Sequence, residues 1–438
     1  MKKQLLATTA LVAGGLMAGA AQAADPIKLS LGGYAYTGLT VASQDNTAAS
    51  NGTINGQNDW FVQNNGHQIT TDIGVSDVFW EGEVFFVGET TLDNGIKVGV
   101  NIQLEAYTSN DQVDEHYIYF TGGFGRLVIG AENSAPYIMH YSAPSVGSGF
   151  GLESPTFVPF RPPTANAVGN SSFTPLSLTS DANKITYYTP RFAPGFQFGI
   201  SYTPDDDSQG GAQGTANRGC RGGCAFDAGN GINDNDQEGS LTTGSFHHFV
   251  EVGMNFVRSI NGVDLAFDLG YGTGFIEKQM RSVAGVAGGA LTDESAGFVI
   301  GGDKLYKQKH EVQAGFNVGY AGFTFGGAFH WDNQGLQGAN NRYDFVAGIM
   351  YGAGPWLVAA NGAYSIVQDG RRQTTTAAGS YANRSNDTLV SGLVEGAYIL
   401  GPGVRVYAVG QYSKWEGNGT DSEEADGFGF STGVRLNF

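Results

Sequence analysis

The chain has 438 residues, of which 68 are glycine, and it carries a formal net charge of −18. Charged residues make up only 15% of it, against ~25% in an average protein, whereas aromatic residues reach 12%. The acidic balance argues against nucleic acid as a partner. The aromatic content argues against disorder, and the mean hydropathy of −0.17 excludes a bundle of transmembrane helices.

The first 23 residues have the pattern of a secretory signal peptide. Lys2 and Lys3 form a basic start, residues 5–20 are apolar with small side chains, and 21–23 read Ala-Gln-Ala, a small-x-small cleavage site. A membrane anchor is the alternative, but the apolar stretch is short for a span of ~20 residues. We therefore expect residues 1–23 to be removed and residues 24–438 to form one exported domain.

Behind this leader, apolar and polar residues alternate with the period of two that a half-buried β-strand requires. The C-terminus shows the pattern clearly, because Phe428, Phe430, Val434, Leu436 and Phe438 share one face. We predict sixteen strands, at residues 27–42, 74–92, 96–109, 112–122, 126–133, 183–190, 196–204, 246–259, 263–278, 306–320, 323–333, 342–352, 356–368, 387–400, 404–416 and 426–438.

The connections between these strands alternate in length. Seven are tight, glycine-containing turns, which supply the positive φ that hairpins need: residues 93–95, 123–125, 192–195, 261–262, 321–322, 353–355 and 401–403. The other eight are mostly long and polar. Alternation alone also fits a soluble sandwich, but short turns at one rim, long loops at the other and an even strand count are typical of an outer-membrane barrel.

Aromatic residues and prolines agree with a barrel. Tyr320, Trp356 and Tyr398 lie beside short turns, while Trp331 and Trp415 lie near long loops, as in the two aromatic belts of membrane barrels. Seven of the 13 prolines fall within residues 134–182, and proline cannot donate to a strand ladder. This segment is therefore predicted to be a long irregular loop.

Several stretches carry a family resemblance: Leu31-Gly32-Gly33-Tyr34, and residues 88–106, 114–135, 183–204 and 429–438. With them the chain resembles the Gram-negative general-diffusion porins, most closely those of alphaproteobacteria. The resemblance implies an all-β, 16-stranded antiparallel transmembrane β-barrel with short periplasmic turns, long outer loops and a third loop inserted into the lumen. It also implies a homotrimer, although the second long connection, Thr108–Gln112, is shorter than the one that reaches the neighbouring subunit in relatives.

A barrel of sixteen strands is wide enough for an aqueous channel, so we expect passive diffusion of small hydrophilic solutes and no covalent step. By the resemblance, the loop at 134–182 forms the pore constriction, where acidic loop residues face a basic wall. The candidates in and beside the loop are Glu132, Glu153, Arg161 and Asp181, and those on the wall are Lys97, Arg126, Lys184, Arg405 and Arg435. Each could equally be a solvated lumen residue without a special role.

An acidic lumen is predicted from glutamates on inward faces: Glu81, Glu83, Glu89, Glu105, Glu251, Glu311 and Glu395. Carboxylates that line a pore favour cations. We therefore expect a weak cation preference.

Two further signals concern the long outer loops. Cys220 and Cys224 are too few for a zinc site, and in an oxidising compartment a disulfide between them is the favoured interpretation. Residues 205–207 are three aspartates that could bind divalent cations bridging lipopolysaccharide, although a solvated charge run is the simpler reading. No other cofactor and no metal is expected.

No catalytic motif of a hydrolase, metalloprotease or nucleotide-binding enzyme is present in the sequence. We therefore expect a channel and not an enzyme, in the bacterial outer membrane, in contact with its lipid and lipopolysaccharide. A substrate-selective channel on the same barrel is the first alternative. A secreted all-β enzyme or adhesin is the second, and it should fractionate without detergent.

Overall fold

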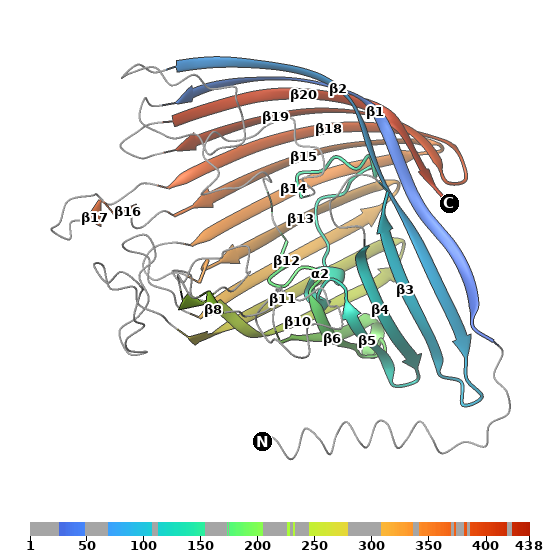
Figure 1. Ribbon diagram of the computed structural model, residues 1–438. Helices are drawn as coiled ribbons and strands as arrows, with labels where there is room; N and C mark the ends of the chain where they lie inside the picture. The colour runs from blue at the N-terminus through green and yellow to red at the C-terminus, as the bar shows by residue number, and fades with distance from the viewer. Residues whose placement is uncertain are drawn as a thin grey trace.

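The computed structural model describes residues 26–48, 69–106, 113–153, 173, 175–204, 226–227, 231–232, 245–278, 308–335, 341–368, 372–373, 381–382, 386–417 and 423–438. Sixteen of the described strands form one closed antiparallel barrel (Figure 1). They are β1 (Lys28–Ala48), β2 (Ile69–Thr91), β3 (Lys97–Glu105), β4 (Val113–Gly122), β5 (Gly125–Ala131), β6 (Asn183–Tyr188), β7 (Phe196–Thr203), β10 (Ser245–Ile260), β11 (Val263–Lys278), β12 (Lys309–Tyr320), β13 (Phe323–Asp332), β14 (Arg342–Ala353), β15 (Trp356–Val367), β18 (Asp387–Gly401), β19 (Val404–Gly417) and β20 (Glu423–Asn437).

The remaining described elements are short. Two small sheets, β8 (Phe226–Asp227) with β9 (Gly231–Ile232) and β16 (Arg372–Gln373) with β17 (Tyr381–Ala382), belong to long connections. A 3-10 turn, η2 (Ala193–Gly195), joins β6 to β7, and one helical turn, α2 (Ala135–Ile138), follows β5. Among the described residues, no helix has the length and apolar character needed to cross a membrane.

The barrel closes between its first and last strands. Each strand pairs with its neighbours in the chain, and β1 also pairs with β20, from Tyr34↔Asn437 to Thr47↔Glu424. The final residue completes the seam, because Phe438 and Gly33 exchange two backbone hydrogen bonds of 2.9 and 3.0 Å. A closed ladder leaves no strand edge unpaired, which is what a bilayer demands of a β-structure.

All sixteen predicted strands are confirmed, with small differences at their ends. The largest extensions lie at the long-loop rim, where β1 continues to Ala48 because it stays paired with the start of β2. The tight turns also lie where predicted. Asn261 and Gly262 have φ of 51° and 81°, and Ala321 and Gly322 have φ of 50° and 85°, the pair of positive angles that matches the twist of a hairpin.

The outer face of the barrel wall is apolar. On β20, Phe428 and Phe430 are 61% and 47% exposed, whereas Gly429 and Ser431 between them are buried. Aromatic pairs lie beside the short turns, with ring centroids 4.5 Å apart in Phe323–Tyr351 and 4.6 Å apart in Trp356–Tyr398. Such a surface is unfavourable in water and suits lipid, with aromatic rings at the interface.

Candidate functional site

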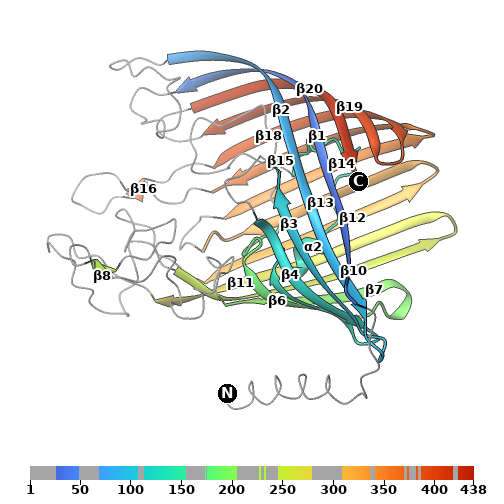
Figure 2. The same ribbon diagram turned by 45° about the vertical axis from the view of Figure 1, so that its right-hand side comes forward.

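The connection from β5 to β6, residues 132–182, folds into the barrel, and we call it the inner loop. In Figures 1 and 2 its described parts, with α2, lie inside the ring of strands. They are residues 132–153, 173 and 175–182. The insertion of the third long loop is therefore confirmed.

The outgoing limb of the inner loop is bound to the wall by polar side chains. Asp268 on β11 accepts the backbone N–H of Tyr141 at 2.8 Å. Further along, Asn317 on β12 donates to the carbonyl of Ser142 at 2.6 Å, and Asn361 on β15 donates to the carbonyl of Pro144 at 2.9 Å. These side chains satisfy backbone groups that no ladder pairs, so an irregular segment can lie at membrane depth.

The tip of the inner loop is held by one carboxylate. Glu395 on β18 is 1% exposed and accepts hydrogen bonds from the N–H of Val146 at 2.9 Å, from the hydroxyl of Ser148 at 2.7 Å and from the hydroxyl of Ser145. The charge on a carboxylate acceptor makes such bonds stronger than bonds between neutral groups. Glu395 thus fixes the loop where it crosses towards β19 and β20.

Two arginines predicted for the wall meet the same tip. Arg405 on β19 donates to the carbonyl of Val146 at 2.6 Å, and Arg435 on β20 donates to the carbonyl of Gly147 at 3.4 Å. Both arginines therefore contact the loop directly and do not face it across the lumen. Their positive charge faces carbonyl oxygens, which are acceptors.

Glycine and aromatic packing lets the tip reach β1. Gly149 has a φ of 87°, and a Cβ there would lie 2.5 Å from the Tyr36 ring. The next residue, Phe150, is 3% exposed and contacts Phe79 and Tyr407 with ring centroids 5.3 and 6.1 Å apart. The tip is thus packed against strands from both sides of the barrel seam.

The return limb binds the wall again. Gln313 on β12 accepts the N–H of Leu176 at 2.7 Å, and Glu251 on β10 accepts the hydroxyl of Thr179 at 2.7 Å. Phe173, fully buried, stacks on His140 of the outgoing limb at a centroid distance of 6.0 Å. The two limbs are therefore packed together as well as held to the wall.

Lys184 closes the base of the inner loop. Only 3% exposed, it donates to the carbonyls of Glu132, Ser180 and Ala182, the last two at 2.7 and 2.6 Å. One ammonium group therefore joins the two ends of the loop. Burial of its charge is compensated by three acceptors.

The inner faces of β3 and β4, which we call the open wall, differ from the wall strands that bind the inner loop. Their polar side chains mostly bond to each other or to β2: Asn101 donates to Tyr117 at 3.0 Å and Gln103 donates to Glu115 at 2.8 Å. The ammonium of Lys97 lies 2.7 Å from the carboxylate of Glu89 on β2. The first two residues of the inner loop bond to the open wall, since Glu132 is hydrogen-bonded to Tyr117 and Asn133 donates to Glu115 at 2.9 Å.

One acidic group lies beside the open wall. Carboxylate oxygens of Glu81, Glu83 and Glu105 lie within 4.8 Å of one another, and among the described residues these are the side chains that could hold a metal ion together. Glu83 also accepts the hydroxyl of Tyr34 at 2.6 Å. Carboxylate groups of this kind are common without a metal, and this one adds negative charge to the inner face of β2 and β3.

The predicted constriction residues fall into three groups. Arg405, Arg435 and Glu153 lie at the tip of the inner loop, while Glu132, Asp181 and Lys184 lie at its base. Lys97 and Arg126 lie on the wall away from the tip, with the Arg126 guanidinium 4.8 Å from the Tyr119 ring centre. Arg161, Cys220, Cys224, the aspartates at 205–207 and the leader 1–23 are outside the described residues.

Sequence reasoning missed the wall side chains that hold the loop. Asp268, Gln313, Asn317 and Asn361 were not singled out, and Glu251 and Glu395 were read as lumen charge. Their signal in the sequence is only that polar residues occupy inward positions. That signal does not distinguish a residue facing water from one facing a loop.

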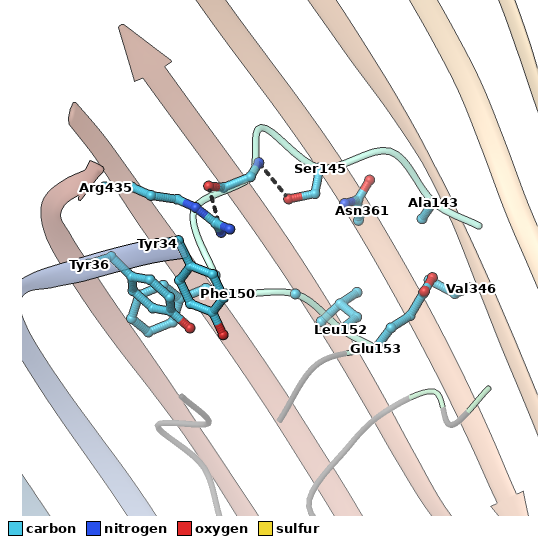
Figure 3. A pocket seen from close by; sticks show the side chains of 13 residues that line it. Tyr34, Tyr36, Ala143, Ser145, Phe150, Leu152, Glu153, Val346, Asn361 and Arg435 are labelled. Carbon is cyan, nitrogen blue, oxygen red and sulfur yellow. Dashed lines mark hydrogen bonds between the residues drawn. The ribbon is translucent and has the colours of Figure 1, made fainter. Parts of the chain in front are cut away.

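A cavity of about 390 Å³ lies at the tip of the inner loop (Figure 3). The loop contributes Glu153 and the backbone around Gly147, and the wall contributes Tyr34, Asn361 and Arg435. Figure 3 shows Arg435 and Glu153 at opposite sides of this space. The cavity is therefore lined by groups of both charges.

Burial changes the acidity of loop carboxylates. Burial raises the pKa of Glu153 to about 7, and the nearby charge of His140 and a hydrogen bond from the backbone of Ala143 offset part of this effect. Burial also raises the pKa of Glu132, against the opposing charges of Arg126 and Lys184. The loop charge therefore depends on pH near neutrality.

Comparison with known proteins gives a family match over most of the chain. Residues 7–418 match the model of the family described as Gram-negative porin. A search of curated proteins found no match.

Solved structures share the fold at low sequence identity. One is a loop L8 deletion mutant of OmpT, an outer membrane protein of Vibrio cholerae, with a TM-score of 0.51 and 11% identity over 94% of this chain and 100% of that one. Another is an anion-selective porin from Comamonas acidovorans, with a TM-score of 0.50 and 14% identity over the same shares. At this identity the likeness concerns the fold.

Proposed function

The chain belongs to the Gram-negative porins, and from this premise we propose that its inner loop is the constriction of a weakly cation-preferring pore. The family and the closed barrel make the protein an outer-membrane channel for passive diffusion of small hydrophilic solutes. They indicate a channel rather than an enzyme.

The observation that supports the constriction is that the tip of the inner loop is bound to the barrel wall. Its tip is bound by Glu395, Arg405 and Arg435, on strands remote in sequence from the loop. A loop fixed in this way reduces the cross-section through which solutes pass, so pore width and the charges beside it set selectivity. We assign Glu153 to this narrow region, with the segment 134–182 as the constriction loop.

Cation preference is supported by the charges of the open wall and its neighbours. Glu83, Glu105 and Glu115 lie there, and the positive charge of Lys97 is paired with Glu89. The solved porin from Comamonas acidovorans is anion-selective on the same fold, so the sign of selectivity must come from side chains rather than from the barrel. Excess carboxylate in this chain favours cations.

The test is single-channel recording in a planar bilayer with detergent-purified protein and a salt gradient. Large ohmic steps are expected from an open pore, with a reversal potential of the sign for cation preference. Folded protein that gives no steps would contradict the constricted open pore. Steps with a reversal potential of the opposite sign would contradict the cation preference alone.

A homotrimer is proposed from family membership, with apolar barrel walls as the contact surface. Current steps that close in threes would support it, and a single-barrel mass in detergent would contradict it.

The signal peptide at 1–23 is tested by the N-terminal residue of the mature protein. The disulfide Cys220–Cys224 is tested by alkylation without reductant, since free thiols would react.

Contact with outer-membrane lipid and lipopolysaccharide is proposed from the apolar outer wall, and the aspartates at 205–207 are the candidate site for bridging divalent cations. Magnesium-dependent binding of lipopolysaccharide that is lost on replacing these aspartates by asparagine would support this. Unchanged binding would contradict it.

A further inference from the structure

Two tyrosine–histidine pairs lie on the outer wall near its long-loop rim. Tyr202 on β7 and His248 on β10 are hydrogen-bonded at 2.8 Å through the hydroxyl and Nδ1, and their rings stack with centroids 6.2 Å apart. Tyr271 on β11 and His310 on β12 repeat the arrangement, with the same hydrogen bond at 2.8 Å and centroids 6.1 Å apart. We call these four residues the histidine patch.

Both pairs use the same diagonal of the strand ladder. Each histidine lies two residues before the residue directly opposite its tyrosine, which is Val250 on β10 and Val312 on β12. Long side chains on this diagonal share a face and can reach each other. The same contact is therefore built twice, once on each of two neighbouring strand pairs.

The first pair depends on a β-bulge. The pairing of β10 with β11 shifts register between His247 and Val250, and His248 has a φ of 55°. A positive φ is uncommon at residues other than glycine, and a bulge turns a side chain to a new direction. The pairing of β11 with β12 at the second pair has no such shift. Two different local backbones thus give the same ring geometry.

The patch faces away from the lumen. Tyr202 and Tyr271 are 39% and 38% exposed, His248 is exposed and His310 is half-buried. Ser201, the inward neighbour of Tyr202, is buried and bonds to the inner loop. In an outer-membrane barrel the outward face meets lipid, and its ends lie at the level of the headgroups.

The polar edge that the patch offers is imidazole Nε2. When a tyrosine hydroxyl donates to Nδ1, the ring proton lies on Nε2, and a protonated imidazole carries a proton there as well. Among the described residues, neither His248 nor His310 is ion-paired with a carboxylate. Lys309 and Glu311, on either side of His310, are ion-paired with each other on the inner face. The patch therefore offers N–H donors to an acceptor outside the wall.

A lipid phosphate is the acceptor that fits this position. Apolar side chains that suit acyl chains adjoin the patch on the same face, among them Ile200, Val252 and Phe275. An ammonium headgroup has no acceptor for an imidazole N–H, whereas a phosphate has several and is negatively charged. Because one strand separates β10 from β12, the two imidazoles lie roughly 10 Å apart. A headgroup with two phosphates can therefore contact both.

We propose that the histidine patch binds the phosphate groups of an anionic lipid in the outer leaflet, with Nε2 of His248 and of His310 as donors. The proposal rests on the lipid contact proposed above and deepens it, because it names a site that needs no divalent cation. The aspartates at 205–207 would hold a phosphate only through such a cation.

The test is lipid binding to the detergent-purified protein, measured by native mass spectrometry in the presence of EDTA. The probes are lipid A with two phosphates and the same lipid after enzymatic removal of both. The phosphorylated lipid is expected to bind at least about tenfold more tightly, as gain of one charge-assisted hydrogen bond predicts. Inorganic phosphate at the same concentration is expected not to displace it, because it lacks acyl chains.

Matched variants locate the site. His248→Gln and His310→Gln are each expected to weaken binding of phosphorylated lipid A by about tenfold. Tyr202→Phe keeps the ring and removes the hydroxyl that orients His248, so about threefold weaker binding is expected. The control His116→Gln removes an imidazole from β4, outside the patch, and is expected to leave binding within about twofold.

The outcomes separate this site from lipid contact in general. Equal binding of phosphorylated and dephosphorylated lipid A would overturn the patch and leave the lipid contact intact. Displacement by inorganic phosphate, equal weakening by His248→Gln and His116→Gln, or binding that appears only when magnesium replaces EDTA would overturn the patch as well. Absence of binding of either lipid to folded protein would contradict the proposed lipid contact itself.

Discussion

Between β10 and β20, several polar side chains of the inner wall bond to the inner loop, whereas on β3 and β4 they bond mainly to one another or to β2. Glu395 and Glu105 show the difference. Glu395 is buried and holds the loop tip through hydrogen bonds from Val146, Ser148 and Ser145, while Glu105 belongs to an acidic group beside the lumen. The same residue type thus fixes the inner loop on one side of the barrel and belongs to a cluster of carboxylates on the other.

This comparison is tested most strongly at the two lysines. Lys184→Met removes the donor for three carbonyls at the base of the inner loop and should lower the free energy of unfolding by about 3 kcal/mol. The matched variant Lys97→Met should lower the free energy of unfolding by less than ~1 kcal/mol, because the Lys97 side chain is 45% exposed in its ion pair. Urea unfolding in detergent measures both. Equal losses would show that the base of the loop is not the more tightly held region.

Single-channel conductance should respond to the glutamate that holds the loop tip, Glu395. Glu395→Gln retains one acceptor oxygen where two are used, so it should loosen the loop tip by about 1–2 kcal/mol and raise both conductance and current noise. The reversal potential should change little, because this side chain is buried. If conductance stays at the wild-type level, the tip does not limit the pore.

Selectivity should show the reverse dependence. Glu105→Gln is expected to shift the reversal potential towards anions, with conductance nearly unchanged, because it removes a charge from the acidic group beside the lumen. The salt-gradient measurement on Glu395→Gln is the matched control. A larger shift from the buried Glu395 than from Glu105 would reverse the assignment of the two walls.

The smallest effect is expected from pH, through Glu153. Its pKa is raised to about 7, so it is protonated below that pH and ionised above it, and cation preference should fall as pH drops from 8 to 6. His140, Asp268 and Arg435 also face this region, so the Glu153→Gln variant is needed as the reference. A profile of equal steepness in that variant would assign the titration to another group.

The raised pKa of Glu153 also determines whether stability rises or falls with pH. The folded state holds the Glu153 proton up to about pH 7, whereas an unfolded carboxyl loses it near its ordinary value, so the native state binds more protons between these limits. Stability from this group is therefore present at low pH and is lost as pH rises through about 7. Glu153→Gln should flatten that part of the unfolding profile.

The barrel could be predicted from the sequence because its signals are local. A period of two fixes which side chains face lipid, and Asn261-Gly262 or Ala321-Gly322 mark a hairpin without reference to distant residues. The same alternation predicts an inner face for Arg405 and Arg435, and in the structure both donate to carbonyls of the inner loop.

The wall side chains that hold the inner loop could not be predicted in this way. Glu395 and Asp268 bind the loop only because the chain between β5 and β6 passes them, and no local pattern records that path. Lys184 was expected on the pore wall by its inward position, and it lies there but is covered by three carbonyls. Burial of that kind depends on the loop fold.

The position of those contacts along the chain has a consequence for assembly. The loop tip bonds to Glu395, Arg405 and Arg435, which follow it by 249, 259 and 288 residues. Local hairpins can form early, but contacts this distant in sequence require the last three strands to be in place. The contacts that hold the loop tip are therefore completed last, and a barrel that has not yet closed at Phe438 and Gly33 lacks a fixed inner loop.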